Sequence, residues 1–324
     1  MITLLQSREG RADKVEQMVI DTFIRKSEVL ELLPFDNAVS PNGGSTLVYG
    51  YVQTKTPSTA AFRAIGSEYT PNEATVEKKT VALAIFGGAF EIDRVIKSIE
   101  GQLNNMAFQL EQKIEAAVSV FHDGMINGDV ATNANGFDGL DKFLVGTTNE
   151  FGTDKVIDLS TMEQLKANAD VFYEALTNLI NRAGANAIFV NEDMKTKIQT
   201  VARVLGYKTE SEEAFGRTIT NINGVRIIDL GNKYDASGVK TPIINKVTRD
   251  VGGSTTGLTD IYAVKFDVND GFHGVTITGD DVIQQYLPDF SQPGALKKGE
   301  VEMVACVALK NANNAGVLSN FNIS

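Results

Sequence analysis

The sequence is poor in the residues on which much protein chemistry depends. It has one cysteine, two histidines and no tryptophan. The single thiol, Cys306, excludes an intrachain disulfide and any metal site built from several thiolates. His122 and His273 are a poor supply for a zinc site or for catalysis by imidazole groups. The composition therefore argues against enzymes that depend on clustered thiols or histidines.

Long apolar runs are also absent. No stretch approaches the roughly 18 apolar residues that a membrane-spanning helix needs. The first residues lack the charged segment and the long apolar segment of a secretory signal. We therefore expect a protein that makes no membrane contact and is made in the cytoplasm.

Positive charge is in deficit. The 30 Lys and Arg residues are outnumbered by 41 Asp and Glu residues, which gives a net charge of −11. Sequence-independent binding to nucleic acid depends on Lys and Arg contacts with phosphate, so this charge argues against it. The charge does not prevent the protein from enclosing nucleic acid, because a container need not bind its contents.

The motifs of common sites are missing as well. The sequence has no GxxxxGK[ST], strand-linked GxGxxG, HExxH, CxxC or GxSxG motif. Gly87–Gly88 is an isolated pair, expected at a bend from a strand into a helix. The segment DVNDGFHG near Asp267 only weakly resembles a calcium loop, because its glycine comes one position early and the final Glu is absent. A hairpin turn is the simpler prediction there, and we predict no catalytic, cofactor-binding or metal-ligating residue.

Several isolated residues have a simpler structural interpretation. Cys306 is expected to be a small buried residue, and His273, which follows a turn, is expected to be exposed. His122 lies near the end of a predicted long helix, where a histidine interacts favourably with the helix dipole. Glu91 and Asp93 are expected at the start of that helix, where acidic side chains are stabilising. Paired carboxylates for acid–base catalysis are the alternative.

Two lysine pairs are candidates for surface contacts. The pairs are Lys78–Lys79 and Lys297–Lys298. Both are expected on the solvated surface. Acidic patches on a neighbouring subunit are the alternative partners.

The length of 324 residues and the hydrophobic content of 43% suit about two globular domains with a sizeable core. Apolar residues recur with charges between them in the first 35 residues, at Val15, Val19, Phe23, Val29, Leu32 and Leu33. This pattern predicts a short amphipathic helix followed by an extended segment that ends at Pro34. The segment is too short to bury its own apolar face, so we expect it to pack elsewhere on the chain or on a neighbour.

Residues 43–86 predict a long β-hairpin. GSTLVYGYVQTKT alternates like a strand, Gly66–Pro71 has the composition of a turn, and a second alternating run follows. The tip is expected to be polar and cannot form a core by itself. The hairpin is therefore either a flexible arm or a surface that lies on a partner.

The clearest predicted helix follows the hairpin. Its apolar residues recur every three or four positions, at Val95, Ile99, Leu103, Met106, Leu110, Ile114, Ala117 and Phe121. A helix of this extent is roughly 40 Å long. The lack of sustained charge pairing at the flanking positions favours a helix lying across a sheet over a coiled coil. A loop rich in Asn, Asp and Gly follows from Asn127 to Gly136.

From about residue 140 to 245 the pattern predicts an α/β unit with a mixed sheet. Ser160 and Glu163 have capping-box spacing for a helix that continues to about Arg182. Asn191 is the predicted N-cap of a second helix, and Gly206–Arg217 is expected to be a loop. Further segments have strand character: NAIFVN, GVRIIDLG, TPIINK, TDIYAVKF, GVTIT and VEMVACVALK.

The order of these elements resembles the HK97-type major capsid proteins of tailed bacteriophages. Residues 62–93 are similar to the family's E-loop and its passage into the P-domain. Residues 108–129, with NGFDGL after them, resemble the spine helix and the loop that leaves it. Residues 186–202 and GVRIID resemble A-domain elements, and residues 301–321 resemble the closing strand and short tail. The resemblance covers nearly the whole chain.

This resemblance implies an α+β fold with a defined division of the chain. The implied segments are an N-terminal arm (1–42), an E-loop hairpin (43–86), a first part of the P-domain with the spine helix (87–139), an A-domain (140–248), a second part of the P-domain (249–310) and a C-terminal tail (311–324) that is free to return to the A-domain.

The resemblance also implies a structural role. The chain would form the homo-pentamers and homo-hexamers of an icosahedral virion shell around double-stranded DNA, after synthesis in the host cytoplasm. A-domains would cluster at capsomer centres, E-loops would lie over adjacent subunits, and P-domains would meet at three-fold positions. Scaffolding and portal proteins are the further partners implied.

The chain departs from some members because it lacks a long helical N-terminal extension. We therefore expect either a separate scaffold or a processed form, although Met1 argues against cleavage. Some members are cross-linked between subunits. Lys55, Lys78 and Lys79 lie in the predicted hairpin, but nothing in the sequence supports a covalent bond from any of them.

Two alternatives belong to other functional classes. An encapsulin-type compartment shell has the same fold but encloses protein cargo. Neighbouring genes for terminase or portal would favour a virus, and genes for cargo enzymes would favour a compartment. An unrelated α/β enzyme would require a pocket where a nucleophile, a base or a metal set converges.

Overall fold

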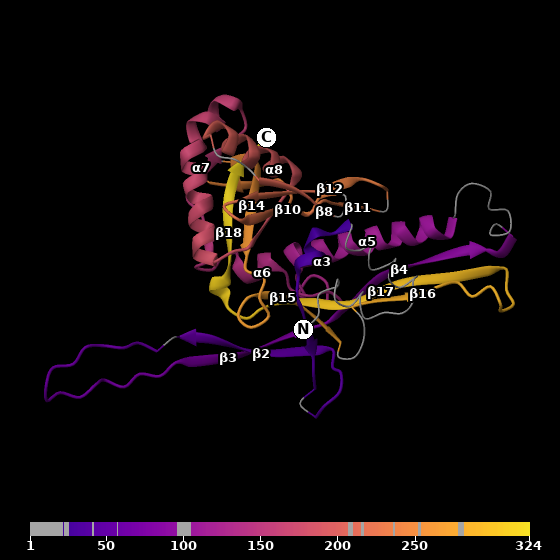
Figure 1. Cartoon of the computed structure of the whole chain (residues 1–324), viewed down its shortest axis with the longest axis horizontal. Helices are drawn as coiled ribbons and strands as arrows, with labels where there is room; N and C mark the ends of the chain where they lie inside the picture. Colours follow the sequence, from indigo (N-terminus) through magenta and orange to yellow (C-terminus); the bar gives the residue numbers. More distant parts are fainter. Residues whose placement is uncertain are drawn as a thin grey trace.

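The computed structural model describes most of the chain. The described residues are 22, 26–40, 42–56, 58–95, 105–206, 210–214, 217–235, 237–251, 254–277 and 282–324. Within them the fold is α+β, with two larger sheets in different parts of the molecule and a long hairpin that projects away from both (Figure 1). Across these ranges, no helix combines the length and the apolarity that a bilayer crossing requires.

One sheet has five strands, in the order β1-β15-β17-β16, with β4 paired to β17. Its strands are β1 (Phe35–Ala38), β4 (Ala84–Asp93), β15 (Phe272–Ile277), β16 (Ile283–Tyr286) and β17 (Leu296–Leu309). The long helix α5 (Asn105–Asn127) packs across β4 and β17 (Figure 1). The prediction that this helix lies across a sheet is confirmed.

The predicted apolar stripe of α5 faces this sheet. Its buried members are Leu110, Ile114, Ala117 and Phe121. Phe121 stacks on Phe86 of β4 with 5.9 Å between the ring centroids. Because full burial of a large apolar side chain contributes about 1.5–3 kcal/mol, the stripe fixes the helix on the sheet. The stripe positions Ile99 and Leu103 lie outside the described residues.

Gly87 and Gly88 lie within β4, so their predicted place at a bend into a helix is wrong. At Gly87 a Cβ would overlap the carbonyl oxygen of Val301 in β17. At Gly88 a Cβ would lie 2.9 Å from Cδ of Lys113 in α5. The pair therefore permits close packing of β4 against both neighbours, a tertiary requirement that the local sequence does not reveal.

The second sheet has nine strands, in the order β5-β18-β14-β7-β10-β9-β8, with β13 paired to β14 and β6 to β18. Its strands are β5 (Glu150–Phe151), β6 (Ile157–Asp158), β7 (Ala187–Val190), β8 (Glu210–Ala214), β9 (Arg217–Ile222), β10 (Val225–Asp229), β13 (Val247–Asp250), β14 (Ser254–Val264) and β18 (Ala315–Asn322). Parallel and antiparallel pairs both occur, for example β7–β10 and β7–β14. The predicted mixed sheet is confirmed.

Two amphipathic helices accompany the nine-stranded sheet, α7 (Met162–Ala183) and α8 (Glu192–Val204). The N-cap of α7 is Thr161, whose hydroxyl accepts a hydrogen bond from the Gln164 amide. The predicted cap at Ser160 is therefore wrong by one residue. Asn191 caps α8 as predicted, because its side-chain oxygen accepts from the Met194 amide at 2.8 Å.

Two predicted connections differ from the structure. The segment Gly206–Arg217 is not a loop throughout, because β8 and β9 form an antiparallel hairpin there; residues 207–209 and 215–216 lie outside the described part. The turn near Asp267 does not close a hairpin. It carries the chain from β14 in the nine-stranded sheet to β15 in the five-stranded sheet.

The described part of the N-terminal segment packs on its own chain. Helix α3 (Glu28–Leu32) buries Val29 and Leu30, and Leu33 after it is buried too. Strand β1 pairs in parallel with β15. Of the two expected sites for this segment, the structure therefore places it on the chain's own body. The predicted helix positions Val15, Val19 and Phe23 lie outside the described residues.

The projecting hairpin is formed by β2 (Val48–Thr56) and β3 (Thr75–Ala82). The predicted hairpin is thus confirmed, and Figure 1 shows that its far end stands clear of the remaining elements. The smaller elements are α6 (Leu140–Leu144), the paired strands β11 (Asn232–Tyr234) and β12 (Lys240–Pro242), and the 3-10 turn η1 (Ala312–Asn314).

The chain crosses between the two sheets more than once. The nine-stranded sheet takes β13 and β14 from after residue 246 and β18 from after residue 314. The division at 140–248, 249–310 and 311–324 stays a proposal. In it, β14 falls in the second part of the P-domain, although it pairs with β7, and only the C-terminal tail is free to return to the A-domain.

Candidate assembly surface

The residues considered for chemistry do not converge on one site. Cys306 lies in β17 and is fully buried, as predicted. Burial raises the pKa of its thiol to about 12, so the thiol stays protonated at neutral pH. It acts as a small apolar residue of the core.

His122 lies near the end of α5, as predicted, and joins three parts of the chain. Its Nε2 is 2.7 Å from Oγ of Ser27, and its Nδ1 is 2.9 Å from the carbonyl oxygen of Leu230. A carbonyl can only accept, so Nδ1 carries the proton and Nε2 accepts from the Ser27 hydroxyl. The same hydroxyl accepts from the Leu30 amide and caps α3. The buried imidazole therefore links the N-terminal segment, α5 and the end of β10.

His273 is buried, and the prediction that it is exposed is wrong. It lies in β15, edge-on to the ring of Tyr49 at 5.8 Å, and its Nε2 has no hydrogen-bond partner among the described residues. Burial lowers the pKa of the imidazole to about 4. His273 does follow a turn, as predicted. It then lies in β15, which is paired on both sides by β1 and β17, so its side chain is buried.

A polar cluster surrounds this histidine at the base of the hairpin. The Tyr49 hydroxyl of β2 donates to Asp36 of β1 at 2.6 Å. The Lys310 ammonium lies 3.6 Å from the same carboxylate and 5.6 Å from the centre of the Tyr49 ring. Although burial opposes it, the hydrogen bond from Tyr49 helps to lower the pKa of Asp36. These contacts hold the base of β2 on the five-stranded sheet.

In the acidic pair Glu91 and Asp93, and in the lysine pair Lys297–Lys298, the two members lie in different environments. Glu91 lies in β4, so its predicted place at the start of the long helix is wrong. Asp93 accepts a hydrogen bond from the Val95 amide, where helical structure begins. Lys297 is buried and donates to the carbonyl oxygens of Gln292 and Pro293, contrary to the expected surface position.

The other members of the lysine pairs are exposed. Lys298 forms an ion pair with Glu300 at 2.5 Å, and Lys78 and Lys79 are exposed on β3. Near Asp267, the Lys265 ammonium pairs with Asp270 at 3.1 Å. In the ranges that the structure covers, no three His, Cys, Asp or Glu side chains gather as a metal site would require.

A groove of about 1130 Å³ lies between α5 and residues 229–234. Its charged walls are largely occupied with one another. Lys233 pairs with Asp123 at 2.8 Å, and Lys26 pairs with Glu115 at 3.5 Å. His122 in its wall is held by the two hydrogen bonds described above. The arrangement holds elements together and does not present a nucleophile beside a base.

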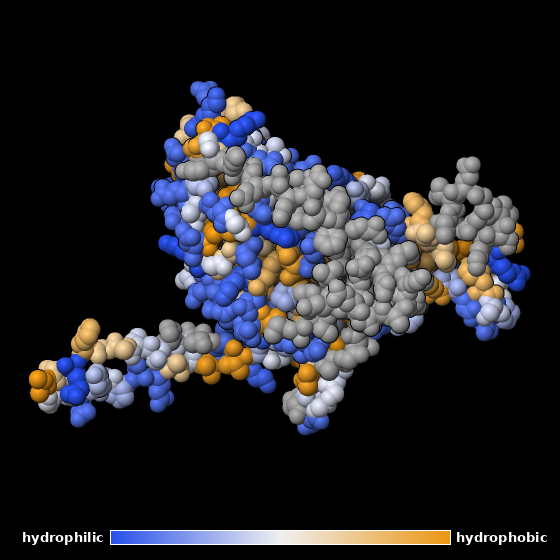
Figure 2. Space-filling view, viewed as in Figure 1, coloured by the Kyte–Doolittle hydropathy of each residue, from blue (hydrophilic) through white to orange (hydrophobic). Residues whose placement is uncertain are grey.

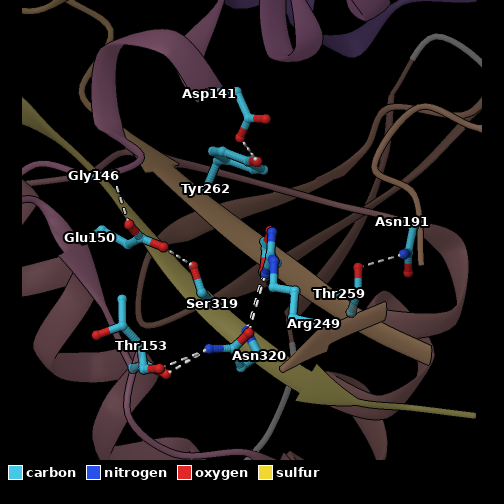
Figure 3. Close-up of polar contacts among 12 residues, drawn as sticks. Asp141, Gly146, Glu150, Thr153, Asn191, Arg249, Thr259, Tyr262, Ser319 and Asn320 are labelled. Carbon is cyan, nitrogen blue, oxygen red and sulfur yellow. Dashed lines mark hydrogen bonds and ion pairs between the residues drawn. The ribbon is translucent and has the colours of Figure 1, made fainter. Parts of the chain in front are cut away.

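A second polar network lies inside the nine-stranded sheet (Figure 3). The Arg249 guanidinium makes a two-pronged ion pair with Asp260, with both N–O distances 2.5 Å. The Tyr262 hydroxyl donates to Asp141 at 2.5 Å, although burial raises the pKa of that carboxyl. Ser319 of β18 donates to Glu150 at 3.0 Å. These contacts join β13 to β14, β14 to α6 and β18 to β5, which is a structural role.

The most exposed large apolar side chains in the described part of the chain lie on the hairpin. At its tip, Phe62 and Ile65 are fully exposed, and Tyr69 is 60% exposed. Figure 2 shows apolar side chains gathered at the free end of the arm. The expectation of a polar tip is therefore wrong for these three residues. Their unpatterned spacing among polar residues gave no periodic signal.

The tip is held in shape by its own contacts. The Arg63 guanidinium lies 5.4 Å from the centre of the Tyr69 ring and donates to the Ser67 carbonyl oxygen at 3.1 Å. Across the two limbs, the Asn72 amide donates to Thr59. Such contacts reduce the entropy that ordering the tip on a partner would cost. The tip presents its apolar residues in a prepared arrangement.

One face of the hairpin shaft is also apolar and exposed. Directly paired residues share a face, and side chains alternate along each strand. The register therefore places Val48 and Val52 of β2 on the same face as Val76 and Ala82 of β3. The three valines are 50–65% exposed. Lys78 is the only charged residue on this face within β2 and β3. Thr54 and Thr80 also lie on this face, and exposed valines gathered in this way favour a protein–protein contact.

Comparisons with known proteins are informative at the level of structure. No family model matches the sequence, and no curated protein matches it. An encapsulin of Synechococcus elongatus PCC 7942, solved as the holo-SrpI complex, matches with a TM-score of 0.58 and 12% identity, over 92% of this chain and 88% of that one.

Two further structures match to a similar degree. The capsid of a native GTA particle has a TM-score of 0.57 and 10% identity, over 91% of this chain and 90% of that one. The structure of Mycobacterium phage Bobi has a TM-score of 0.54 and 10% identity, over 92% and 91%. At these identities the likeness is one of fold. The chain has the HK97-type capsid fold, as predicted from its sequence.

Proposed function

We propose that this chain is the major capsid protein of a tailed phage, which assembles into the pentamers and hexamers of an icosahedral shell. The observation that carries the proposal is the hairpin. It projects from the body, keeps its apolar tip and one apolar face in solvent, and belongs to a capsid fold. A second copy of the chain supplies the missing apolar contact.

Symmetry supports a second copy as the partner. A protruding arm on one side of a subunit makes a heterologous contact, in which one surface of each copy meets a different surface of the next. Such contacts form rings when the rotation closes. The molecule fits this requirement because the hairpin projects on one side and the body lies on the other (Figure 1).

The proposed contents are double-stranded DNA, enclosed without sequence-specific binding. The net charge of −11 supports containment over a tight electrostatic grip. A scaffolding protein and a portal protein are the proposed further partners. Residence in the virion follows from this role, after synthesis in the host cytoplasm.

An encapsulin-type compartment is the second candidate. The similarity in fold to the Synechococcus encapsulin favours it to the same degree as the similarity to the GTA and phage structures favours a virus. Both candidates predict a closed shell. Neighbouring genes for terminase and portal would support the capsid, whereas a neighbouring cargo enzyme would support the compartment.

Electron microscopy of the purified full chain tests the shared prediction. Shells, tubes or capsomer rings that grow in number with protein concentration are expected. A small monodisperse monomer at every concentration would contradict both shell functions. A double substitution at Val52 and Val76 to Ser is expected to weaken assembly, because it makes the exposed apolar face polar.

A further inference from the structure

Strand β18 occupies an interior position in the nine-stranded sheet, although it comes late in the chain. It pairs with β14 on one side and with β5 and β6 on the other. Its partners lie far earlier in the sequence, at residues 150–158 and 254–264. Every residue of β18 is buried except the last, which is partly exposed.

The side chains of β18 complete the core beneath α7. The Phe321 ring lies edge-on to Phe172 of α7, with 5.3 Å between the centroids. Leu318 and Phe321 are less than 5% exposed and belong to the same apolar cluster as the buried face of α7. Removal of this strand would expose the face of α7 that carries Phe172.

A bulge in β18 connects the strand to the polar network of Figure 3. Thr259 pairs with Phe321, but Ile261 pairs with Leu318, so β18 carries one extra residue there. Asn320 sits in this bulge with a φ of 71°, a left-handed conformation that Asn tolerates better than most residues.

The bulge turns Asn320 toward buried polar groups. Its backbone N–H donates to the Asp260 carboxylate at 3.2 Å. Its side-chain nitrogen donates to the carbonyl oxygen of Gly152 at 3.1 Å. Arg249 donates to the Asn320 side-chain oxygen at 3.3 Å. Asn320 therefore forms hydrogen bonds with β14, with β13 and with the loop after β5.

The earlier strands depend on β18 for their pairing. In the part of the chain that the structure describes, β5 and β6 pair with no other strand. The rest of the sheet can form β14-β7-β10-β9-β8 without it, but β14 would then lose the neighbour that runs along most of its length. Without residues 315–322, β5 and β6 are not connected to the strands that begin at β14.

We propose that β18 is a gate that links assembly to synthesis of residues 315–322. Before these residues are available, the predicted A-domain lacks its closed sheet and cannot make capsomer contacts. Copies being made on one messenger are thereby kept from joining before residues 315–322 have been made. This inference rests on the proposed shell function for its second half, whereas the dependence of the sheet on β18 stands independently.

Ribosome-bound chains provide the test. The full 324-residue chain is followed by a linker and a translation-arrest sequence, in two versions. A short linker keeps residues 315–322 inside the ribosomal tunnel, and a long linker places them outside. A third version combines the long linker with Phe321→Asp, which places a charge in the buried core and prevents insertion of β18.

Two measurements separate the two halves of the inference. Protease cleavage between residues 160 and 230 is expected to be at least about tenfold faster with the short linker, because cleavage tracks the open population. The Phe321→Asp version should behave like the short-linker version. Only the long-linker chains of native sequence should co-sediment with free purified chain.

The outcomes distinguish the dependence of the sheet on β18 from the link between β18 and assembly. Equal protease resistance with both linkers overturns the gate, whatever the chain assembles into. Efficient association of the short-linker chains with free chain also overturns it. A clear difference in resistance without any association of the long-linker chains supports the dependence on β18 and contradicts the shell function instead.

Discussion

At the scale of single residues, the structure gives its few histidines and its lone cysteine interior roles. His122 links three segments through two hydrogen bonds, His273 lies edge-on to Tyr49, and Cys306 is a protonated core residue. The sequence predicted that these residues would not form an active site. It could not predict that His273 is buried, because burial there depends on β15 pairing with strands distant in sequence.

His273 predicts a loss of stability on acidification. Its pKa is about 4 in the folded protein and near 6.5 in the unfolded chain, so the unfolded state takes up the proton first. Stability from this residue is therefore full above pH 6.5 and is lost as the pH falls toward 4, by about 3 kcal/mol at most. The neighbouring charges are Asp36, Asp267 and Lys310.

Urea unfolding between pH 7.5 and 4 measures this loss. His273→Phe keeps the ring contact with Tyr49 but cannot titrate, so its curve should fall less steeply than that of the native chain. Parallel curves over this pH range would show that another group is responsible.

Asn320 predicts a difference between two small substitutions. Asn320→Ala removes the side-chain hydrogen bonds and keeps a Cβ at a φ of 71°, which costs roughly 1–2 kcal/mol for most residues. Asn320→Gly removes the same bonds without that strain. We expect both variants to be destabilised and Asn320→Ala to be the less stable by about 1 kcal/mol. Denaturant unfolding of both variants decides this, and equal stabilities would argue against backbone strain at the bulge.

At the scale of elements, the sequence predicted those with strong local signals. The stripe of α5, the cap at Asn191 and the alternation of β2 and β3 all fix local structure, and the structure contains each of them. Strand β8 was predicted as part of a loop because its segment is polar. The glycines of β4 were misplaced because their role is set by β17 and α5.

The hairpin tip predicts a separation of assembly from stability. Phe62 and Ile65 make no buried contact in the single chain, so Phe62→Ser with Ile65→Ser should change the free energy of unfolding by less than about 0.5 kcal/mol. The same pair should strongly reduce particle formation, because exposed apolar anchors commonly dominate a contact.

Sedimentation velocity and thermal unfolding measure the two effects. Val171→Ser provides the matched control, because Val171 is 55% exposed on α7, a helix that Figure 1 shows away from the free end of the hairpin. Normal assembly of the tip variant would show that the tip is not an anchor.

At the scale of the whole molecule, the sequence predicted the fold through the order of its elements. The sequence left open whether the N-terminal segment packs on its own chain or on a neighbour, and it placed the long helix across a sheet. The described N-terminal residues and α5 bury their apolar faces on their own chain, and the hairpin alone among these three elements stays exposed. The interior place of β18 was not predicted, since a strand's neighbours depend on topology and not on local pattern.

A reconstruction of assembled particles by cryo-electron microscopy tests the central claim most directly. The account predicts closed shells in which Phe62 and Ile65 of each copy are buried against the adjacent copy. Particles whose hairpins stay in solvent, or a chain that remains monomeric at every concentration examined, would contradict it.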